Sequence, residues 1–513
     1  MIDASASPLM LFNSLTRSLE TFEPVHPGVP GDPANPPEAR VYSCGPTVYN
    51  FQHIGNMRAY VFADTLGRTL KFKDYKLRHI INITDVGHLT SDADVGDDKM
   101  EKAAAQQGKT AWDVAAFYTA EFKRDLNWLN VRDPAKWTVA TDYVARMIEF
   151  AKRIADTHCY ELDSGLYFDV STVADYGRLA RAVTDDGEGR IDEVEGKRHA
   201  ADFAIWRKTP VGETRQMEWD SPWGRGAPGW HLECSVMGEA ELGMPFDIHT
   251  GGIDHREIHH PNEIAQNQAY RGCGGLDCAE HSGARMWMHN NFLIDRGGKM
   301  SKSTGEFLRL QLLVDRGYHP LAYRLMCLQA HYRSELEFSW EGLGAAFTRL
   351  KRMYKTVEKR KSEQFELTGT PVDDPALFEP IPRDKWHETE ILGYLQDFDV
   401  AMSDDLNTPK ALLTLDTVLQ DPSIDNGLRW HIVATLDQVL GLDILRRSQK
   451  SLRVRPKAAT ITVEEIDMLI RRRKDARDAK DFAASDKLRD TLTAAGVEVM
   501  DGDPLGWDWR LEG

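Results

Sequence analysis

The first clear pattern in the chain is a strand, a helix and a second strand between residues 41 and 83. Residues 41–44 form a short β-rich run that ends at a Gly-Pro pair. Apolar side chains then recur at helical spacing, at Tyr60, Ala63, Leu66 and Leu70. Residues 77–83 form the second β-rich run. Two strands joined by a helix in this way must be parallel, so we predict a parallel α/β sheet with its chemistry at the carboxyl ends of the strands.

Downstream patterns divide the rest of the chain. Residues 110–158 have a helical pattern, whereas residues 159–228 are mixed and contain short strands, which indicates an insertion into the sheet domain. A strand resumes at residues 246–249, and the chain is mostly helical beyond about residue 310. Boundaries are predicted at the charged residues 351–366 with the Pro/Asp-rich residues 370–383, and again at residues 448–460. Six prolines within residues 24–39 predict an exposed loop.

Size and charge restrict the class of protein. A chain of 513 residues is too long for one core, and roughly three to four domains are expected. The composition, 42% hydrophobic and 28% charged, is that of a soluble globular protein. The net charge of −17 argues against tight nonspecific binding of nucleic acid, although a local basic groove remains compatible with it.

Cysteine usage and apolar runs bear on the compartment. The six cysteines are sparse and irregularly spaced, so we expect no disulfide framework and a reducing, cytoplasmic environment. The sequence predicts no signal peptide, and no run approaches the ~18 apolar residues of a membrane span.

Two short motifs far apart in the chain carry groups suited to a polyphosphate. One is His-Ile-Gly-Asn at residues 53–56, whose glycine admits close approach of the backbone to a ligand. The other is Lys-Met-Ser-Lys-Ser at residues 299–303, a cationic, donor-rich segment that by itself is also compatible with a solvated surface loop. The two motifs together resemble the HIGH and KMSKS signatures of class I aminoacyl-tRNA synthetases.

A candidate metal site begins at residues 259–263, His-His-Pro-Asn-Glu. Proline is tolerated in a first helical turn, so a helix that starts near residue 260 would place His259 and Glu263 on one face. Cys44 and Cys234 could complete a zinc site. From spacing alone the simpler interpretation is that both cysteines are small buried hydrophobes and that His259 caps a helix, because nothing local joins the two cysteines.

Longer motifs resemble cysteinyl-tRNA synthetases in particular, and the similarity runs from about Leu11 to Arg510. The motifs are Tyr-Ser-Cys-Gly-Pro-Thr-Val-Tyr at 42–49, Asn-Ile-Thr-Asp at 82–85, Gly-Trp-His-Leu-Glu-Cys-Ser at 229–235, His-Thr-Gly-Gly-Ile-Asp at 249–254 and Asp-Asp-Leu-Asn-Thr-Pro at 404–409. At residues 258–262 the chain has Ile-His-His-Pro-Asn where the family more often has Pro-His-His-Glu-Asn, which leaves the candidate ligands intact.

The resemblance completes the predicted fold. We expect an α/β protein with a Rossmann-like parallel-sheet catalytic domain that carries an inserted connective domain, followed by a helical bundle and a small C-terminal anticodon-binding domain. The expected ranges are 1–115 and 229–310 for the two halves of the catalytic domain, 116–228 for the insertion, 311–454 for the stem-contact region and bundle, and 455–513 for the C-terminal domain.

In this family a zinc ion lies in the catalytic site, and the resemblance assigns it to Cys44, Cys234, His259 and Glu263. Around the substrate it implies Gly45, Thr47, Thr84 and Trp230. A pocket that selects by shape separates cysteine from serine by only roughly 10–200-fold, whereas zinc favours a thiolate over a hydroxyl, so no editing site is expected. Whether the substrate sulfur becomes a fifth ligand or displaces one stays open.

The nucleotide site follows from the same resemblance. It implies catalytic roles for His53, Asn56, Lys299 and Lys302, with ATP contacts from His53, Asn56, His249, Gly251, Gly252, Asp254 and Lys302, and magnesium bound with the ATP. Residues 249–254 could otherwise be a plain turn at a strand end. Asn56 stands where the family motif has histidine, and asparagine donates a hydrogen bond but cannot become cationic, so we expect weaker phosphate electrostatics.

The C-terminal residues suggest contact with tRNA. Arg471, Arg472 and Arg473 open a charged helical run, and Trp507 and Trp509 could stack on anticodon bases. The alternative is a solvated helix packed on core tryptophans. In the family this domain reads the anticodon.

The resemblance implies a monomeric enzyme that joins L-cysteine to ATP as cysteinyl-adenylate and transfers it to tRNA(Cys). No protein nucleophile is expected, because positioning and charge stabilisation suffice. One rival is a cysteine:amino-sugar ligase of thiol biosynthesis, which lacks an anticodon domain, so residues 455–513 argue against it. Another is a non-catalytic RNA-binding paralogue, against which Lys302, His53 and the four candidate ligands argue.

Overall fold

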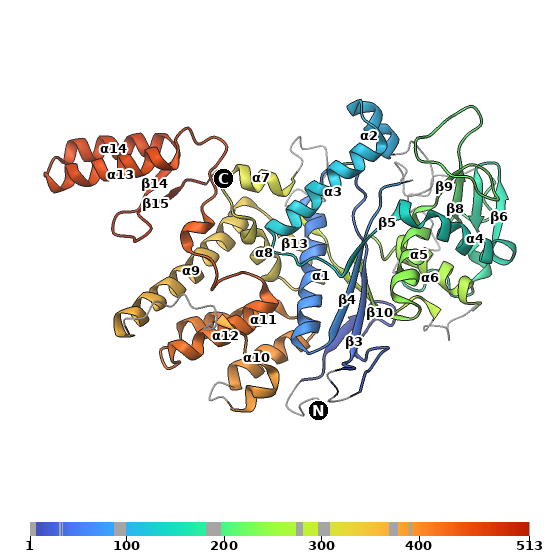
Figure 1. Ribbon diagram of the computed structural model, residues 1–513, viewed down its shortest axis with the longest axis horizontal. Coiled ribbons are helices and arrows are strands. Elements are labelled where there is room, and N and C mark those ends of the chain that lie inside the picture. Colours follow the sequence, from blue (N-terminus) through green and yellow to red (C-terminus); the bar gives the residue numbers. More distant parts are fainter. Residues whose placement is uncertain are drawn as a thin grey trace.

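The computed structural model describes residues 7–29, 32, 34–86, 99–180, 196–272, 281–295, 308–368, 378–388 and 392–511. Its centre is a five-stranded parallel sheet in the order β11-β10-β3-β4-β5 (Figure 1). The strands are β3 Glu38–Ser43, β4 Lys76–Ile83, β5 Lys136–Val139, β10 Phe246–Gly252 and β11 Ala284–Asn290. In chain order this is the doubly wound arrangement, whose strand order reverses between β3 and β10. Ligands bind at such a reversal, beyond the carboxyl ends of the strands.

Helix α1, Ile54–Phe72, connects β3 to β4 and confirms the predicted strand, helix, strand unit. The helix starts where it does because the His53 side chain caps it, accepting a hydrogen bond from the Gly55 amide. The last five residues of β4 are all buried, as expected for an inner strand of a parallel sheet covered on both faces. The N-terminus of α1 therefore lies at the same edge as the carboxyl ends of β3 and β4.

The inserted region forms a separate antiparallel sheet in the order β6-β7-β8-β9, to the right of the main sheet in Figure 1. Its strands are β6 Cys159–Leu162, β7 Gly165–Phe168, β8 Phe203–Lys208 and β9 Gly226–Pro228, and α4 Val144–His158 leads into it. The predicted start of the insertion at residue 116 is too early, because β5 still belongs to the parallel sheet. With only four residues, β5 was hidden within a pattern that favours helices over residues 110–158.

Helices make up most of the remaining structure. The predicted loop at residues 24–39 leads into β3 and has no helix among its described residues. In the described residues the other elements are β1 Met10–Asn13, β2 Ser18–Thr21, α2 Lys99–Gln107, α3 Ala111–Trp128, α5 Trp230–Leu242, α6 His259–Arg271, β12 Leu293–Asp295, α7 Leu310–Asp315, α8 Pro320–Leu328, β13 Leu336–Phe338, α9 Trp340–Thr368, α10 Leu392–Ser403, α11 Thr408–Gln420, α12 Asn426–Leu440, α13 Val463–Asp478, α14 Phe482–Ala494, β14 Val497–Val499 and β15 Trp507–Trp509, with short 3-10 turns at Ala140–Tyr143, Val170–Thr172, Arg383–Glu388 and Gln449–Leu452. No described helix is long and apolar enough to cross a membrane.

The charged residues 351–366 are not a domain boundary. They lie inside α9, which runs without a break from Trp340 to Thr368. Charged side chains form the solvent face of this helix, while Leu350, Met353 and Val357 are buried on the other face. A run of charge on an amphipathic helix therefore looked like a linker.

A buried ion cluster joins the sheet domain to the helical bundle. The Asp64 carboxylate on α1 accepts from Arg68 Nε at 2.6 Å and from Arg324 Nη2 at 2.7 Å, and all three side chains are at most 5% exposed. Arg324 also donates to the carbonyl of Leu440 at the end of α12 at 2.7 Å. Burial opposes ionisation of Asp64, yet the Arg324 and Arg68 guanidiniums hold the pKa of its carboxyl below the usual value. The cluster thus fixes α1, α8 and α12 to one another.

The small C-terminal domain has its own core and docks on α9. The tryptophans Trp507 and Trp509 are each 4% exposed and pack edge to face beside Ile466, Leu492 and Val497. Lys351 of α9 pairs with Asp508 at 2.6 Å, and Lys355 pairs with Asp503 at 2.6 Å. In Figure 1 the α13–α14 hairpin projects from this joint away from the sheet.

Asp64→Asn should lower the free energy of unfolding by about 3–5 kcal/mol, because two buried guanidiniums lose their charged partner. Urea-induced unfolding followed by circular dichroism measures the change. The matched control is Glu149→Gln, which removes an exposed partner of Lys152 and should change stability by no more than ~0.5 kcal/mol.

The same pair of proteins tests the sign of the pH dependence. Since the folded pKa of Asp64 is depressed, its stabilisation is complete above the usual aspartate pKa and is lost as the pH falls through the folded pKa. The stability difference between the native chain and Asp64→Asn should therefore shrink as the solution is made strongly acidic. An Asp64→Asn protein as stable as the control at neutral pH would show that the cluster is not stabilising.

Candidate active site at the carboxyl edge of the sheet

A cavity of about 500 Å³ opens at the reversal of strand order, between the ends of β3, β4 and β10 and the N-terminus of α1. Most of the residues predicted for the site line it. They are Cys44, Gly45, Thr47, His53, Asn56, Thr84, Trp230, Cys234, Gly251, Gly252, Asp254 and His259. Segments separated by up to about 200 positions in the sequence therefore converge on one cavity.

Two glycines let the backbone close in around this cavity. A β-carbon at Gly45 would lie 1.5 Å from the Asn82 carbonyl oxygen, so no side chain fits between β3 and β4 at this point. A β-carbon at Gly251 would lie 2.7 Å from the His260 ring. Both positions require glycine because of close approach, which confirms that these turns are closely packed rather than loose.

His53 and the start of α1 form a site suited to phosphate. His53 Nδ1 accepts from the Gly55 amide at 3.0 Å, which leaves Nε2 as the donor nitrogen of the ring. Asn56 is exposed on the first turn of the helix, whose amides and dipole favour an anion. The motif thus presents three kinds of donor to the cavity: a ring N–H, a side-chain amide and the helix N-terminus.

Asn82 organises the wall opposite and was missed in the sequence interpretation as a site residue. Its Oδ1 accepts from the Gly45 amide at 2.7 Å, and its Nδ2 donates to Thr84 Oγ1 at 3.1 Å. Thr84 in turn donates to the fully buried Glu233 at 2.9 Å. The only signal in the sequence was its place in the Asn-Ile-Thr-Asp motif, which gives no hint of the contact with Gly45.

The four candidate metal ligands come together. Cys44 follows β3, Cys234 lies on α5, and His259 and Glu263 lie one turn apart on α6. One ligand atom from each lies within 4.8 Å of the others, and the site is buried. The objection that nothing joins Cys44 to Cys234 is removed by the fold, because the pairing of β3 with β10 and the packing of α5 on the sheet bring them together.

The charges in this cluster complement one another. A hydrogen bond from Cys44 lowers the pKa of the Cys234 thiol to about 6, while burial raises the pKa of Cys44 well above its usual value. Burial opposes a charge on His259, but Glu263 and Cys234 raise its pKa to about 10. Burial likewise opposes ionisation of Glu263, but His249 and His259 lower its pKa to about 2. His259 and Glu263 therefore stabilise each other's charged forms inside one buried space.

The structure also brings in two histidines that form a second possible ligand set. Cys44, His249, His260 and Glu263 likewise have ligand atoms within 4.8 Å of one another. His260 Nε2 lies 3.3 Å from Cys44 Sγ, and His260 Nδ1 lies 2.8 Å from His289 Nε2. His260 and His289 were missed as site residues, because the sequence places them on a helix and a strand without indicating which way they face.

His249 does not line the cavity, which corrects its predicted contact with ATP. It is 2% exposed, its ring stacks on Trp287, and its Nε2 lies 3.0 Å from Glu263 Oε2. Side chains alternate between the two faces along β10, and His249 lies on the face that packs against Glu263 of α6. Its contact is with a candidate metal ligand rather than with the nucleotide space.

Trp230 and His231 hold the ring of His259. Trp230 stacks on His259 with ring centroids 4.3 Å apart, and His231 Nδ1 lies 2.9 Å from His259 Nδ1. This contact occupies Nδ1 and leaves His259 Nε2 pointing to Glu263 Oε1 at 3.0 Å. The other oxygen, Oε2, is held by His249, so Oε1 is the oxygen of Glu263 that faces the cluster.

The Asp-Asp-Leu-Asn-Thr-Pro motif at 404–409 joins parts of the fold instead of lining the cavity. Asp405 accepts from the amide of Phe12 at 2.9 Å, from Tyr332 at 2.7 Å and from Arg333 at 2.6 Å. Its φ of 51° lies in the left-handed region that few residues other than glycine occupy. The motif thus ties the N-terminal strand to the start of the bundle.

The predicted tRNA residues of the C-terminal domain differ in their surroundings. Arg471 and Arg472 are exposed on α13, whereas Arg473 is 6% exposed and forms two hydrogen bonds with Asp501. Stacking of bases on Trp507 and Trp509 is excluded by their burial in the core, so the alternative of core tryptophans is correct. The predicted catalytic lysines Lys299 and Lys302 lie outside the described residues.

Two family models match the chain. Residues 31–348 match the class I tRNA synthetase (C) catalytic domain, and residues 462–510 match the cysteinyl-tRNA ligase anticodon binding domain. The LeuRS–tRNA–LeuAMS ternary complex of Agrobacterium radiobacter K84 has a similar fold, with a TM-score of 0.52 at 12% identity over 82% of this chain and 84% of that one.

Curated relatives match along nearly the whole length. The cysteine–tRNA ligase of Novosphingobium aromaticivorans is 64% identical over 99% of this chain and 98% of its own, and that of Zymomonas mobilis is 50% identical over 99% of both. With a parallel-sheet cavity, a convergent Cys-Cys-His-Glu cluster and both domains matched, the chain belongs to the cysteine–tRNA ligase family of class I tRNA synthetases.

Proposed function

We propose that this chain is a cysteine–tRNA ligase. In the first step the carboxylate of L-cysteine attacks the α-phosphate of ATP, forming cysteinyl-adenylate and releasing pyrophosphate. In the second, the 3′ adenosine of tRNA(Cys) attacks the carbonyl carbon and AMP leaves. The observation that carries the proposal is the convergence of Cys44, Cys234, His259 and Glu263 on the wall of a cavity that also holds the His53 motif.

The donor set fits zinc. Two thiols, one imidazole and one carboxylate are ligands that Zn²⁺ accepts at about 2.0–2.3 Å, and Glu263 Oε1 and His259 Nε2, 3.0 Å apart, both face the cluster. When bound there, zinc would supply a contact that prefers the substrate thiolate to the hydroxyl of serine. We favour Cys44, Cys234, His259 and Glu263 over the set with His249 and His260, because two sulfur ligands suit zinc better than one.

The surrounding residues orient the ligands. His249 holds Glu263 Oε2, and His231 holds His259 Nδ1, so each ligand offers one defined atom to the metal. Thr84 is fixed by Asn82 and Glu233, and Gly45 by Asn82, so this wall of the cavity is rigid where the amino acid would bind. Trp230 covers the His259 ring and keeps water from that side.

ATP would lie across the start of α1. His53 Nε2–H, Asn56 and the helix amides would hold phosphate oxygens, Gly251 and Gly252 would leave room for the adenosine, and exposed Asp254 could accept from a ribose hydroxyl. Magnesium would accompany the phosphates. Lys302, and Lys299 beside it, would stabilise negative charge on the departing pyrophosphate.

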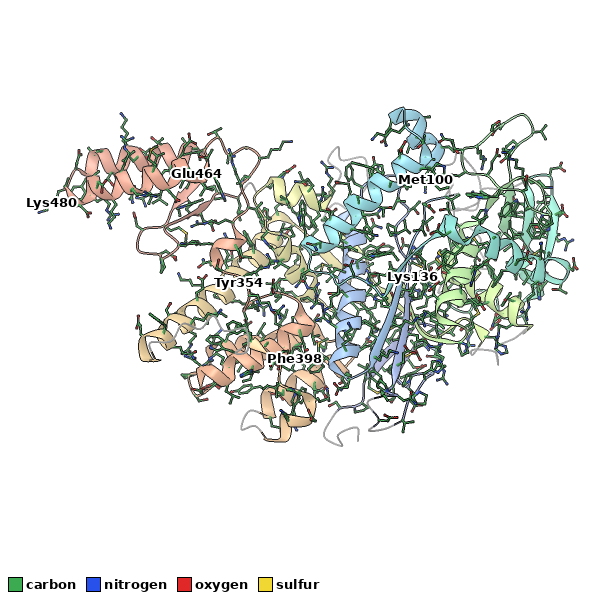
Figure 2. All side chains as sticks on the ribbon, viewed as in Figure 1. Met100, Lys136, Tyr354, Phe398, Glu464 and Lys480 are labelled. Atoms are coloured by element: carbon green, nitrogen blue, oxygen red, sulfur yellow. The ribbon has the colours of Figure 1, made fainter. Side chains whose placement is uncertain are left out.

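We place tRNA recognition at the tip of the α13–α14 hairpin. Phe482 is 63% exposed at the start of α14, and Lys480, labelled in Figure 2, marks the same far end of the hairpin. An exposed aromatic ring beside cationic side chains suits an unstacked base. Arg471 and Arg472 would contribute contacts to the tRNA backbone.

We further propose a monomeric enzyme of a reducing cytoplasm. Among the described residues, Cys44, Cys159, Cys234 and Cys327 are all free thiols, which agrees with such a compartment. Size-exclusion chromatography with light scattering measures the mass in solution.

The purified chain should charge tRNA(Cys) with cysteine, and Lys302→Ala should slow cysteine-dependent ATP–pyrophosphate exchange by about 10²–10³-fold. Cysteine affinity should change little, because Lys302 acts on phosphates. Lys152→Ala, at an exposed lysine of α4, is the control. Exchange without charging of any tRNA would favour the cysteine:amino-sugar ligase. Absence of both exchange and charging would favour a non-catalytic RNA-binding paralogue.

The purified protein should contain about one zinc per chain, and Cys44→Ser and Cys234→Ser should each contain far less, since hydroxyls replace thiolate ligands. Elemental analysis of the untreated proteins measures the metal. Cys159→Ser, at a thiol away from the cluster, should keep its zinc. An unchanged zinc content in both Cys44→Ser and Cys234→Ser would assign the metal to other residues.

Phe482→Ala should weaken binding of tRNA(Cys) by ~1–3 kcal/mol, because a stacked base loses its platform. Phe482→Trp should retain affinity, and Phe482→Leu should behave like alanine, since leucine keeps apolar bulk without a ring. Trp507→Ala should instead destabilise the C-terminal domain by about 3–5 kcal/mol. Equal tRNA affinity in the phenylalanine, alanine and leucine proteins would remove Phe482 from the interface.

A further inference from the structure

A second cavity, of about 170 Å³, lies on the flank of α1 away from the metal cluster. It is open to solvent and is bordered by the second half of α1, the outer part of β4 and residues 131–135, which lead into β5. Its volume is well above the ~10–15 Å³ that one water molecule requires. Tyr60 and Ala63 line both this cavity and the substrate cavity, so the two are neighbours separated by one layer of side chains.

The walls of this cavity carry an excess of positive charge. Lys71, Arg68 and Arg132 line it together with the carboxylates of Asp64 and Asp133. Asp64 is already held by Arg68 and by Arg324, which lies behind the wall. Lys71 is exposed on the last turn of α1, and among the described residues its ammonium has no hydrogen bond or ion pair. The carboxylates near Lys71 and Arg132 are therefore Asp133 and the already paired Asp64. The Arg132 guanidinium also donates to the carbonyl of Gln438 at 3.2 Å.

The cations also repel one another. Burial and, after it, the nearby charge of Arg68 together lower the pKa of Arg132 to about 10. Burial lowers the pKa of Lys71 as well, followed by the charges of Arg132 and Arg68. A bound anion would relieve this repulsion, which makes the cavity a better site for negative than for neutral ligands.

A buried histidine adds a hydrogen-bond donor to this cavity. His79 on β4 is 7% exposed and lines the cavity. Its Nε2 lies 2.8 Å from Ser43 Oγ, which lies 2.6 Å from Thr250 Oγ1, whereas its Nδ1 has no hydrogen-bond partner in the described part of the chain. Burial lowers the pKa of His79 to about 4, so the ring is neutral at pH 7 and can donate from Nδ1 while Nε2 accepts from Ser43. Gly67 borders this nitrogen: a β-carbon there would lie 3.9 Å from Nδ1.

We propose that this cavity binds a small phosphate-class oxyanion, held by Lys71, Arg132 and His79 Nδ1. The arrangement combines two cations with a neutral ring donor, which is the set of charge-assisted and directional hydrogen bonds that phosphate oxygens accept. The cavity has about a third of the volume of the substrate cavity, so it suits orthophosphate or pyrophosphate rather than a nucleotide. The site is distinct from the ATP position, which lies at the other end of α1.

The test is isothermal titration of the full-length chain with orthophosphate and, in a separate arm, with pyrophosphate. The substrate cavity is first saturated with a non-hydrolysable ATP analogue in the absence of cysteine, so that its phosphate contacts, including those for the departing pyrophosphate, are occupied. Saturable binding of one anion per chain is expected in at least one arm, and the arm that binds more tightly identifies the anion.

Variants locate the site. Lys71→Met and Arg132→Gln should each weaken binding about tenfold, the effect of losing a charge-assisted hydrogen bond, and Asp133→Asn should strengthen it. Lys76→Met is the matched control, because Lys76 lies on β4 outside the cavity and pairs with Glu38 at 3.4 Å. Its binding should equal that of the native chain.

Gly67→Ala tests the cavity without removing a charge. The added methyl group meets only the flexible end of Leu77 at 3.0 Å and lies against His79 Nδ1, and alanine suits a helix better than glycine, so the variant should fold and bind the anion more weakly. Circular dichroism checks its fold. Absence of saturable binding to the native chain in both arms, or weakening by Lys76→Met as large as that by Lys71→Met, would overturn the proposal.

Discussion

The parallel pairing of β3 with β10 is the contact on which the site depends. Val41, Tyr42 and Ser43 pair with Ile248, His249 and Thr250, residues about 200 positions later in the chain. The pairing creates the reversal of strand order and brings the residue after β3, Cys44, beside α5 and α6. A shift of one residue would turn every side chain to the opposite face, and Cys44 would then point away from Cys234. The close contact of Gly45 with Asn82 fixes β4 in the same register.

The candidate metal cluster beside this strand pairing costs free energy when no ligand is bound, because it buries charged groups. Cys234, His259 and Glu263 are all at most 3% exposed, and charges in such a place are stable only when each has a partner. His260 and His289 lie beside them as neutral rings, since burial lowers the pKa of both well below the usual value. The packing of the surrounding residues thus holds the sulfur and nitrogen donors of the cluster in place. On the proposed function, a divalent cation there is what balances two thiolates and a carboxylate.

The sequence was sufficient where a pattern is local. The strand, helix, strand unit and the helix start that places His259 and Glu263 on one face follow from short-range rules and from motifs. What could not be predicted depends on side-chain direction or on distant contacts. His249 faces Glu263 because of alternation along β10, which requires knowing which face of that strand is buried. The meeting of Cys44 with Cys234 was supplied by the family resemblance and not by spacing.

Other errors have physical causes of the same kind. The four residues of β5 are too few to show a period, so the neighbouring helices dominated the pattern. Charged residues on α9 were mistaken for a boundary because the apolar face of that helix lies between them. Trp507 and Trp509 are large and near the end of the chain, and nothing in a Trp-Asp-Trp sequence tells a core pair from an exposed one when the partner strand β14 is only three residues long.

Burial of those tryptophans gives the C-terminal domain a definite place relative to the sheet. The Arg453 guanidinium lies 3.9 Å from the centroid of the Trp507 ring, and the lysines of α9 hold Asp503 and Asp508, so the hairpin is attached through a packed core instead of a free linker. The buried cluster at Asp64 then joins α1 to α8 and α12, and α9 packs on α8. A rigid series of contacts therefore runs from the base of the α13–α14 hairpin to the helix that begins at His53. On the proposed function, a tRNA held at the hairpin tip would meet the cavity at a separation set by this framework. Two fixed points of contact would then let a protein with a net charge of −17 bind one long polyanion without a broad basic surface.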